Sequence, residues 1–297
     1  MRLIHLTDPH LSSLAGQSFR ALRGKRRSGY LSWTYKRQWI YRRETVELLT
    51  AAIRAEAADQ LILSGDLIQI GLEQEIREVS SWLAELAPSH QIFFVPGNHD
   101  VYARDSWTAL RHHWNFVLPT AANGVPDSST SAYPFTRDLG LVRLIGVSSA
   151  CVTPIFSARG SLGKDQFRRL AGVLQQTRES GRLPCLAIHH PPLPHMSPWR
   201  KALKEVRALQ ALISAQQPAL VWCGHQHRNM ELIEGAARVF CTASAASVNQ
   251  ASFRIFDIDP PGQGRQQSWS ICMRLKTIAA DRTHFALADE KHWSFTL

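Results

Sequence analysis

The chain has 297 residues, of which 44% are hydrophobic, and this length and composition allow one domain spanning 1–297 with a sizeable core. No stretch approaches the roughly 20 apolar residues that a membrane-spanning helix needs, and the N-terminus becomes polar too early for a signal peptide, so we expect a cytoplasmic protein without a transmembrane segment. The formal net charge of +10 favours acidic partners: phosphate substrates, nucleic acid or an anionic membrane surface.

The first predicted strand, 2–8, leads into a segment of unusual composition. Residues 11–43 contain no acidic residue, and aromatic side chains are interleaved with basic ones. We interpret this segment as a basic and aromatic cap inserted within the domain. Its nine basic residues are Arg20, Arg23, Lys25, Arg26, Arg27, Lys36, Arg37, Arg42 and Arg43.

Helices and strands then alternate along the chain. Apolar residues at helical spacing predict helices at 41–57, 72–87, 163–180 and 199–216. Short apolar runs that stop at polar or glycine-containing turns predict buried strands at 59–67, 91–100, 141–149, 183–192 and 219–227. This alternation indicates an α/β protein.

The pattern changes after residue 235, where strand-like runs follow one another without helices. These runs lie at 237–247, 252–260 and 269–279. We expect them to form a second sheet that packs on the first, with helices outside.

Side chains of metal-ligand type follow five of the predicted strands. Ligands of open α/β sheets bind at the loops after the carboxyl ends of the strands. Residues two apart at a strand end point the same way, so Asp8 and His10 can bind one ion together, and His225 and His227 can share one ion or divide between two. Asp66, after a glycine, is the candidate to bridge two ions. Carboxylate and imidazole ligands suit manganese, iron or zinc.

The motifs D-x-H, G-D, G-N-H-D, H and G-H-x-H occur in this order from Asp8 to His227. In this set the chain resembles the calcineurin-like metallophosphoesterase superfamily. The resemblance implies a four-layer α/β/β/α sandwich of two mixed β-sheets flanked by helices. It also implies a metal-dependent phosphoric ester or pyrophosphate hydrolase with two divalent metal ions, manganese being favoured and iron, zinc or magnesium the alternatives.

The resemblance also implies a role for each polar residue. His189 is preferred to His190, because the ligand of the family usually comes first in an H-H-P run. The first ion would be held by Asp8, His10 and His227, Asp66 would bridge both ions, and the second ion would be completed by Asn98, His189 and His225.

His99 and Asp100 are the expected catalytic residues. His99 would act as a general acid or phosphate-stabilising group, and Asp100 would orient it, with helix capping as the alternative for Asp100. A hydroxide between two ions roughly 3.5–4 Å apart would attack phosphorus in line. The metals, Asn98 and His99 would contact the phosphate, and no covalent intermediate is needed.

The substrate is open from these motifs alone. The pattern is similar to that of bacterial class III cyclic-nucleotide phosphodiesterases. It is also similar to that of enzymes that cleave UDP-2,3-diacylglucosamine in lipid A biosynthesis. The better-known branch of the latter has arginine where this chain has His99, and a less typical branch keeps the histidine.

The cap discriminates between these substrates. It follows D-x-H directly and must lie near the mouth of the site. It is either a solvated basic face, with Trp33 and Trp39 packing on the core, or a surface that binds lipid or an anionic membrane through residues 19–41. The second interpretation favours a lipid-linked nucleotide such as UDP-2,3-diacylglucosamine, cleaved at the inner face of a membrane, over soluble cAMP.

Three further residues are candidates for substrate contact: Arg20 and Arg23 in the cap, and His195 in the loop 191–198. A nuclease would also use the positive charge. No recognised nucleic-acid module is present, so nucleic acid is not the expected partner. A non-catalytic scaffold with the same fold should lack ligands, and here the set is intact.

Overall fold

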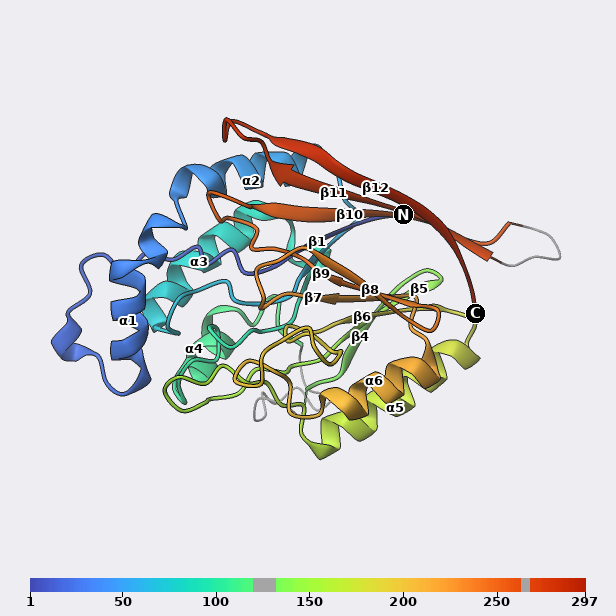
Figure 1. The fold of residues 1–297 in the computed structure, drawn as a ribbon, viewed down its shortest axis with the longest axis horizontal. Coiled ribbons are helices and arrows are strands. Elements are labelled where there is room, and N and C mark those ends of the chain that lie inside the picture. Colours follow the sequence, from blue (N-terminus) through green and yellow to red (C-terminus); the bar gives the residue numbers. More distant parts are fainter. Residues whose placement is uncertain (120–131, 263–267) are drawn as a thin grey trace.

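The computed structural model describes residues 1–119, 132–262 and 268–297. Two six-stranded sheets pack face to face, and helices cover their outer faces (Figure 1). The four-layer α/β/β/α sandwich expected from the sequence is therefore confirmed. None of the helices in these ranges has the length and apolar character needed to cross a bilayer.

The first sheet has the order β12-β11-β10-β1-β2-β3. β1, β2 and β3 run parallel, whereas β10 pairs antiparallel with β1 and is followed by the antiparallel β11 and β12. Helices α2 (Arg43–Ala55), α3 (Glu73–Leu86) and α4 (Ser106–His113) pack on its outer face. The strands are β1 (Arg2–Leu6), β2 (Gln60–Leu63), β3 (Ile92–Phe94), β10 (Ser252–Asp259), β11 (Ser268–Ile278) and β12 (Phe285–Thr296).

The second sheet has the order β4-β5-β6-β7-β9-β8. Its central strands β5, β6, β7 and β9 are parallel, and β4 and β8 are antiparallel edges. Helices α5 (Lys164–Glu179) and α6 (Val206–Gln216) cover its outer face. The strands are β4 (Phe135–Leu139), β5 (Val142–Gly146), β6 (Leu183–Ala187), β7 (Leu220–Cys223), β8 (Met230–Glu234) and β9 (Ala237–Cys241).

The division of strands between the sheets differs from the expected one. The strands after residue 235 do not make the second sheet by themselves: β9 pairs with β7, while β10 and β11 extend the N-terminal sheet through β1. Apolar runs reveal strands but not their hydrogen-bonding partners. The pairing partner depends on the opposing strand, which a single run does not identify.

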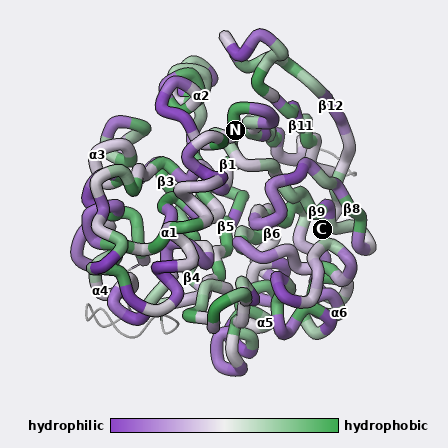
Figure 2. The backbone as a smooth tube through the Cα atoms, turned by 60° about the vertical axis from the view of Figure 1, so that its left-hand side comes forward, coloured by the Kyte–Doolittle hydropathy of each residue, from purple (hydrophilic) through white to green (hydrophobic). Residues whose placement is uncertain are grey.

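Burial on both faces explains the continuous apolar sequence of the central strands. Every residue of β2, β6 and β7 is buried. Leu3, Ile62, Phe93, Trp222 and Phe256 belong to the layer between the sheets. Along α2, α3 and α5 hydrophobic and hydrophilic residues alternate (Figure 2), as expected for helices with one face on a sheet. Because neighbouring central strands are paired in parallel, their carboxyl ends lie at the same edge of each sheet.

One predicted helix starts later than the periodicity indicates. The pattern suggested 199–216, but α6 begins at Val206. The preceding residues run beside 158–160, where the N–H of Ala158 donates to the carbonyl of Arg200 over 3.0 Å and the N–H of Lys204 donates to that of Gly160 over 3.0 Å. This tertiary pairing overrides local helix propensity.

The cap, residues 11–43, lies between β1 and β2 and is folded. It contains α1 (Lys25–Tyr35) and two short 3₁₀ helices, Phe19–Ala21 and Arg37–Trp39. In Figure 1, α1 (dark blue) lies beyond the strand ends and not over a sheet face. Trp33 is buried in a small cluster with Leu14, Leu22, Ile70 and Tyr102, whereas Trp39 is 61% exposed, so only the first tryptophan packs on the core.

Candidate metal centre

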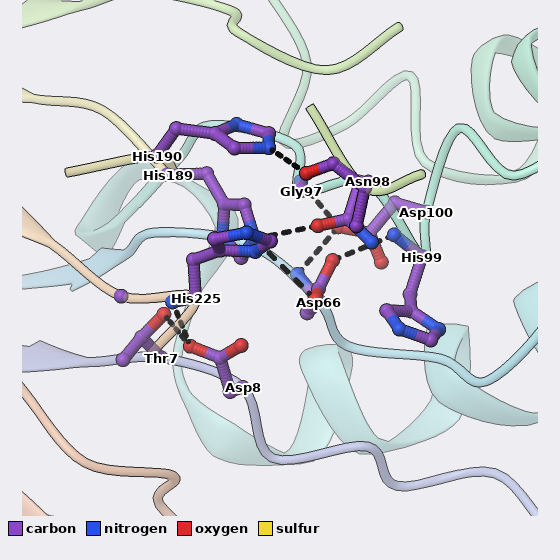
Figure 3. A network of polar contacts seen from close by, with 12 residues as sticks. Thr7, Asp8, Asp66, Gly97, Asn98, His99, Asp100, His189, His190 and His225 are labelled. Carbon is purple, nitrogen blue, oxygen red and sulfur yellow. Dashed lines mark hydrogen bonds and ion pairs between the residues drawn. The ribbon is translucent and has the colours of Figure 1, made fainter. Parts of the chain in front are cut away.

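The structure brings all seven predicted metal ligands to one place, at the carboxyl ends of the parallel strands of both sheets. Figure 3 shows the side chains of Asp66, Asn98, His189 and His225 pointing toward one another, with Asp8 beside His225. All seven are buried except His227, which is half-buried. The set consists of Asp8 and His10 after β1, Asp66 after β2, Asn98 after β3, His189 after β6, and His225 and His227 after β7.

Sharp backbone turns aim these side chains. Five of the seven predicted ligands have positive φ angles: Asp8 (52°), His10 (46°), Asp66 (56°), His225 (68°) and His227 (53°). Residues other than glycine enter this left-handed region rarely and at a cost in energy. Such strain gathers at functional sites, where the surrounding fold enforces it.

Two glycines are required by the close approach of the loops. A Cβ at Gly97 would lie 2.2 Å from Oδ1 of Asp66, and a Cβ at Gly224 would lie 2.0 Å from Oγ1 of Thr7. No side chain larger than hydrogen fits at either position. The glycines of G-N-H-D and G-H-x-H therefore allow these loops to pack against one another.

The first ligand group is Asp8, His10 and His227, whose donor atoms lie within 4.8 Å of one another. Oδ2 of Asp8 accepts hydrogen bonds from Oγ1 of Thr7 over 2.7 Å and from the backbone N–H of His225 over 2.9 Å. Its Oδ1 lies 3.0 Å from Nε2 of His227. Nδ1 of His227 lies 3.1 Å from the hydroxyl of Tyr41, and Nδ1 of His10 lies 3.0 Å from the carbonyl of Ile68.

The second group, with donor atoms also within 4.8 Å, is Asp66, His189 and His225. Nδ1 of His189 donates to the carbonyl of Ser64 over 2.7 Å. Its Nε2 is 3.3 Å from Oδ2 of Asp66 and 3.3 Å from Oδ1 of Asn98. Partners that hold one ring nitrogen fix the tautomer and direct the other nitrogen at a metal.

The donor set fits two cations. Nε2 of His225 is buried and makes no hydrogen bond within the described part of the chain, and the buried Oδ1 of Asp8 has only its 3.0 Å contact with Nε2 of His227, itself a predicted ligand. Buried polar atoms of this kind are costly unless a partner satisfies them. Burial lowers the pKa of His10 to about 4 and the pKa of His225 well below its usual range, so both imidazoles are neutral at pH 7, as ligation requires. Against the effect of burial, Asp66 raises the pKa of His189 to about 10, and a cation would displace that proton on binding.

The arrangement favours His189 over His190 as a ligand. Nδ1 of His190 lies 2.8 Å from the hydroxyl of Ser149, and its Nε2 lies 3.1 Å from the carbonyl of Ala158. Both ring nitrogens are thus engaged by the protein. His189 has only one nitrogen engaged by backbone.

His99 lies beside the two ligand groups at the cleft. Its backbone N–H donates to Oδ1 of Asp66 over 2.7 Å, and its Nδ1 contacts the carbonyl of Gln69. Nη1 of Arg37 lies 3.1 Å from the same nitrogen. Burial, which outweighs the attraction of Asp66, holds the pKa of His99 well below its usual range.

Asp100 does not have the expected partner. Its buried carboxylate accepts backbone N–H groups from Asp66, Leu67 and Gly97, each over 2.8 Å. Among the described residues it makes no hydrogen bond to the ring of His99. Asp100 instead ties the loop after β3 to the loop after β2 and so holds Asp66 in place.

A cleft of about 980 Å³ opens from the ligand groups. His10, Asp66, Asn98, His99, His225 and His227 form its floor, and the cap and the residues near 156 and 199 form its walls. Asp66 is the one carboxylate among the described residues that line it. The basic residues lining it are Lys25, Lys36, Arg37, Arg200 and Lys201.

The predicted substrate contacts Arg20, Arg23 and His195 do not line this cleft. All three side chains are exposed, and their role stays a prediction. Arg37 and Tyr41, from the same cap, reach the site instead. The basic and aromatic composition after D-x-H indicated the segment, but sequence does not indicate which of its cations turns inward.

Comparison with known proteins agrees with this geometry. The family described as calcineurin-like phosphoesterase matches residues 1–229. A 3′,5′-cyclic adenosine monophosphate phosphodiesterase of Vibrio vulnificus is 25% identical over 190 residues, which cover 63% of this chain and 61% of the relative, so the match spans about three fifths of that protein.

Two solved structures share the fold. A dimetal phosphatase from Danio rerio has a TM-score of 0.64 and 14% identity, covering 97% of this chain and 98% of that one. A purple acid phosphatase from yellow lupin (Lupinus luteus) has a TM-score of 0.59 and 12% identity, covering 98% of this chain and 53% of that one.

Proposed function

We propose, from the premise that the chain belongs to the calcineurin-like phosphoesterase family, that it cleaves the pyrophosphate bond of a lipid-linked nucleotide such as UDP-2,3-diacylglucosamine. Membership of the family makes it a metal-dependent phosphoester hydrolase. The choice of substrate rests on the charge of the cleft. Five basic residues line it against the single carboxylate of Asp66, and Asp66 is assigned to the metals.

This charge suits a substrate with more than one phosphoryl group. Nζ of Lys25 is already bound to the hydroxyl of Thr153 over 2.6 Å and to the carbonyl of Ser157 over 3.1 Å. The other four basic residues are Lys36, Arg37, Arg200 and Lys201. Together they carry more positive charge than the single negative charge of a cyclic nucleotide requires. A pyrophosphate diester carries two such charges, and Arg and Lys are the usual ligands of phosphate oxygens.

The apolar part of the substrate would meet exposed aromatic rings. Phe156 and Trp199 line the cleft although they are 84% and 69% exposed. Tyr35 and Trp39, from the cap, are 79% and 61% exposed. Large exposed rings beside basic groups are typical of surfaces that contact lipid head groups and the upper part of acyl chains. We therefore also propose that the cap rests on an anionic membrane.

In the proposed mechanism, Asp8, His10 and His227 would hold one ion, Asn98, His189 and His225 would hold the second, and Asp66 would serve both. The two ions would supply Lewis acidity to the phosphoryl group and lower the pKa of a coordinated water. The contact of Nδ1 with the carbonyl of Gln69 leaves Nε2 of His99 as the nitrogen available to substrate. His99 would donate to the leaving oxygen only as an imidazolium; burial disfavours that form in the free protein, and the negative charge of a bound phosphoryl group would favour it.

A second candidate is hydrolysis of 3′,5′-cAMP, the reaction named for the Vibrio vulnificus relative. The test compares kcat/KM of the metal-loaded protein for UDP-2,3-diacylglucosamine in detergent with that for cAMP, with bis(p-nitrophenyl) phosphate as the generic diester. We expect the pyrophosphate to be preferred by at least about 100-fold. A preference for cAMP, or equal rates, would refute the lipid-linked assignment. Inertness toward all three would refute catalysis by this site on such esters.

A further inference from the structure

We propose that Arg37 is a phosphate-binding residue of this site, supplied by the cap, whose guanidinium binds a non-bridging oxygen of the phosphoryl group next to His99. The inference rests on the proposed dinuclear phosphoesterase site but not on which ester is cleaved. The cap then has a defined function, because it supplies a phosphate-binding residue to the catalytic centre and also forms a wall of the cleft.

The local fold explains how Arg37 reaches the site. Gly29 in α1 packs so closely that a Cβ there would lie 2.6 Å from both Cγ2 of Ile70 and the hydroxyl of Tyr102. This contact brings the carbonyl of Gly29 next to the cleft, where it accepts a hydrogen bond from Nη2 of Arg37 over 2.9 Å. After the short 3₁₀ helix, Tyr41 pairs with Ser247 in an isolated β-bridge, which fixes the other end of the turn.

The guanidinium has donors left over. Nε of Arg37 is buried and has no hydrogen-bond partner among the described residues. Nη1 lies 3.1 Å from Nδ1 of His99, but that nitrogen also contacts the carbonyl of Gln69. A nitrogen that donates to a carbonyl cannot at the same time accept from Arg37. Two of the three guanidinium nitrogens of this half-buried side chain therefore lack a good acceptor, and Nε is buried.

A bound anion would accept hydrogen bonds from these donors. Buried unsatisfied donors of a charged group are costly, and no carboxylate forms an ion pair with Arg37 within the described ranges. Arg37 lines the same cleft as Asp66, Asn98 and His99. A planar fork of N–H donors matches phosphate oxygens, which makes arginine the residue of choice for this contact.

The test measures binding of inorganic phosphate to the metal-loaded protein by isothermal titration calorimetry, without any requirement for turnover. We expect Arg37→Met to raise Kd about 10- to 100-fold, the loss that one charge-assisted contact predicts. Arg37→Lys should recover part of the affinity. The matched control is Arg43→Met, because the side chain of Arg43 is 90% exposed and pairs only with Glu47; its Kd should stay within twofold of the wild type.

Metal content and melting temperature are measured on the same samples. If Arg37→Met lowers either, Arg37→Gln replaces it, since an amide can still donate to Gly29 without the charge. Phosphate affinity of these variants within twofold of the wild type would overturn the inference. If wild-type protein is inert toward the esters above but the Arg37 variants lose phosphate affinity, the substrate proposal fails and the role of Arg37 stands.

Discussion

Asp100 offers the sharpest test of how the site is held, because its carboxylate is wholly buried and accepts three backbone N–H groups. Asp100→Ala leaves all three donors without a partner. Each buried unsatisfied N–H costs about 1–3 kcal/mol. Allowing for a water in the space vacated, we expect a loss of about 4 kcal/mol in the free energy of unfolding. This is a large share of the stability of an ordinary domain.

Asp100→Asn should remove only one of the three hydrogen bonds. Oδ2 accepts from Asp66 and Gly97, and Oδ1 accepts only from Leu67. The amide oxygen of asparagine can replace Oδ2, but its NH₂ group then faces the N–H of Leu67. One N–H is left without an acceptor, compared with three in Asp100→Ala, and we expect the free energy of unfolding to fall by about 1–3 kcal/mol. Metal content should fall in both variants, because the backbone of Asp66 is no longer held.

Urea unfolding followed by tryptophan fluorescence gives the free energies, and inductively coupled plasma mass spectrometry gives metal per chain. Asp105→Asn is the control: its carboxylate is 70% exposed and pairs with Arg26 over 2.7 Å, and exposed pairs contribute about 0–1 kcal/mol. A cost below 1 kcal/mol for Asp100→Ala, with metal retained, would refute the role assigned to these three hydrogen bonds.

Three further predictions address the ligands, the membrane and pH. Asp66→Ala should lose bound metal, whereas His99→Ala should keep it and lose turnover; normal metal content in Asp66→Ala would remove it from the ligand set. Tyr35→Ser with Trp39→Ser should reduce co-sedimentation with vesicles of anionic phospholipid, and equal binding would sink the membrane proposal. Burial depresses the pKa of five histidines, to about 4 for His10 and about 3 for His5 and His190, so metal-free protein should lose stability as pH falls from 6.5 toward 4. The raised pKa values of His189, about 10, and of Asp100, about 7, oppose part of this loss, and an unchanged urea midpoint between pH 7 and pH 5 would contradict the prediction.

The convergence of the seven predicted metal ligands at one strand edge could be anticipated from the sequence. Motifs such as G-N-H-D follow buried strands, and parallel strands in a covered sheet end at one edge, so position along the chain translates into position in space. The same reasoning does not predict the hydrogen bonds that Asp100 makes. A carboxylate that binds backbone N–H groups of another loop has no spacing signature, because two of its three partners, Asp66 and Leu67, lie more than 30 residues away in sequence.

The cap shows the other limit of prediction. Its composition indicated a basic and aromatic surface, yet Arg20 and Arg23 are exposed away from the cleft while Arg37 turns inward. The tight contact of α1 at Gly29 is tertiary, and the carbonyl of Gly29 accepts a hydrogen bond from Arg37 at the cleft. The delayed start of α6 has a similar origin, because the pairing of 200–204 with 158–160 is tertiary and brings Trp199 and Arg200 to the wall of the cleft.

Backbone strain at the predicted metal ligands links metal binding to the stability of the fold. The five ligands with positive φ angles each cost about 1–2 kcal/mol relative to ordinary backbone, and together this approaches the whole stability of a typical domain. The local sequence does not stabilise such turns, so the surrounding structure must stabilise them. The buried strands do this on one side of the loops, and the carboxylate of Asp100 does it on the other. Cations that bind only the folded arrangement add stability by mass action. Metal binding and fold are thus coupled through the same loops, and a defect in either should appear in both.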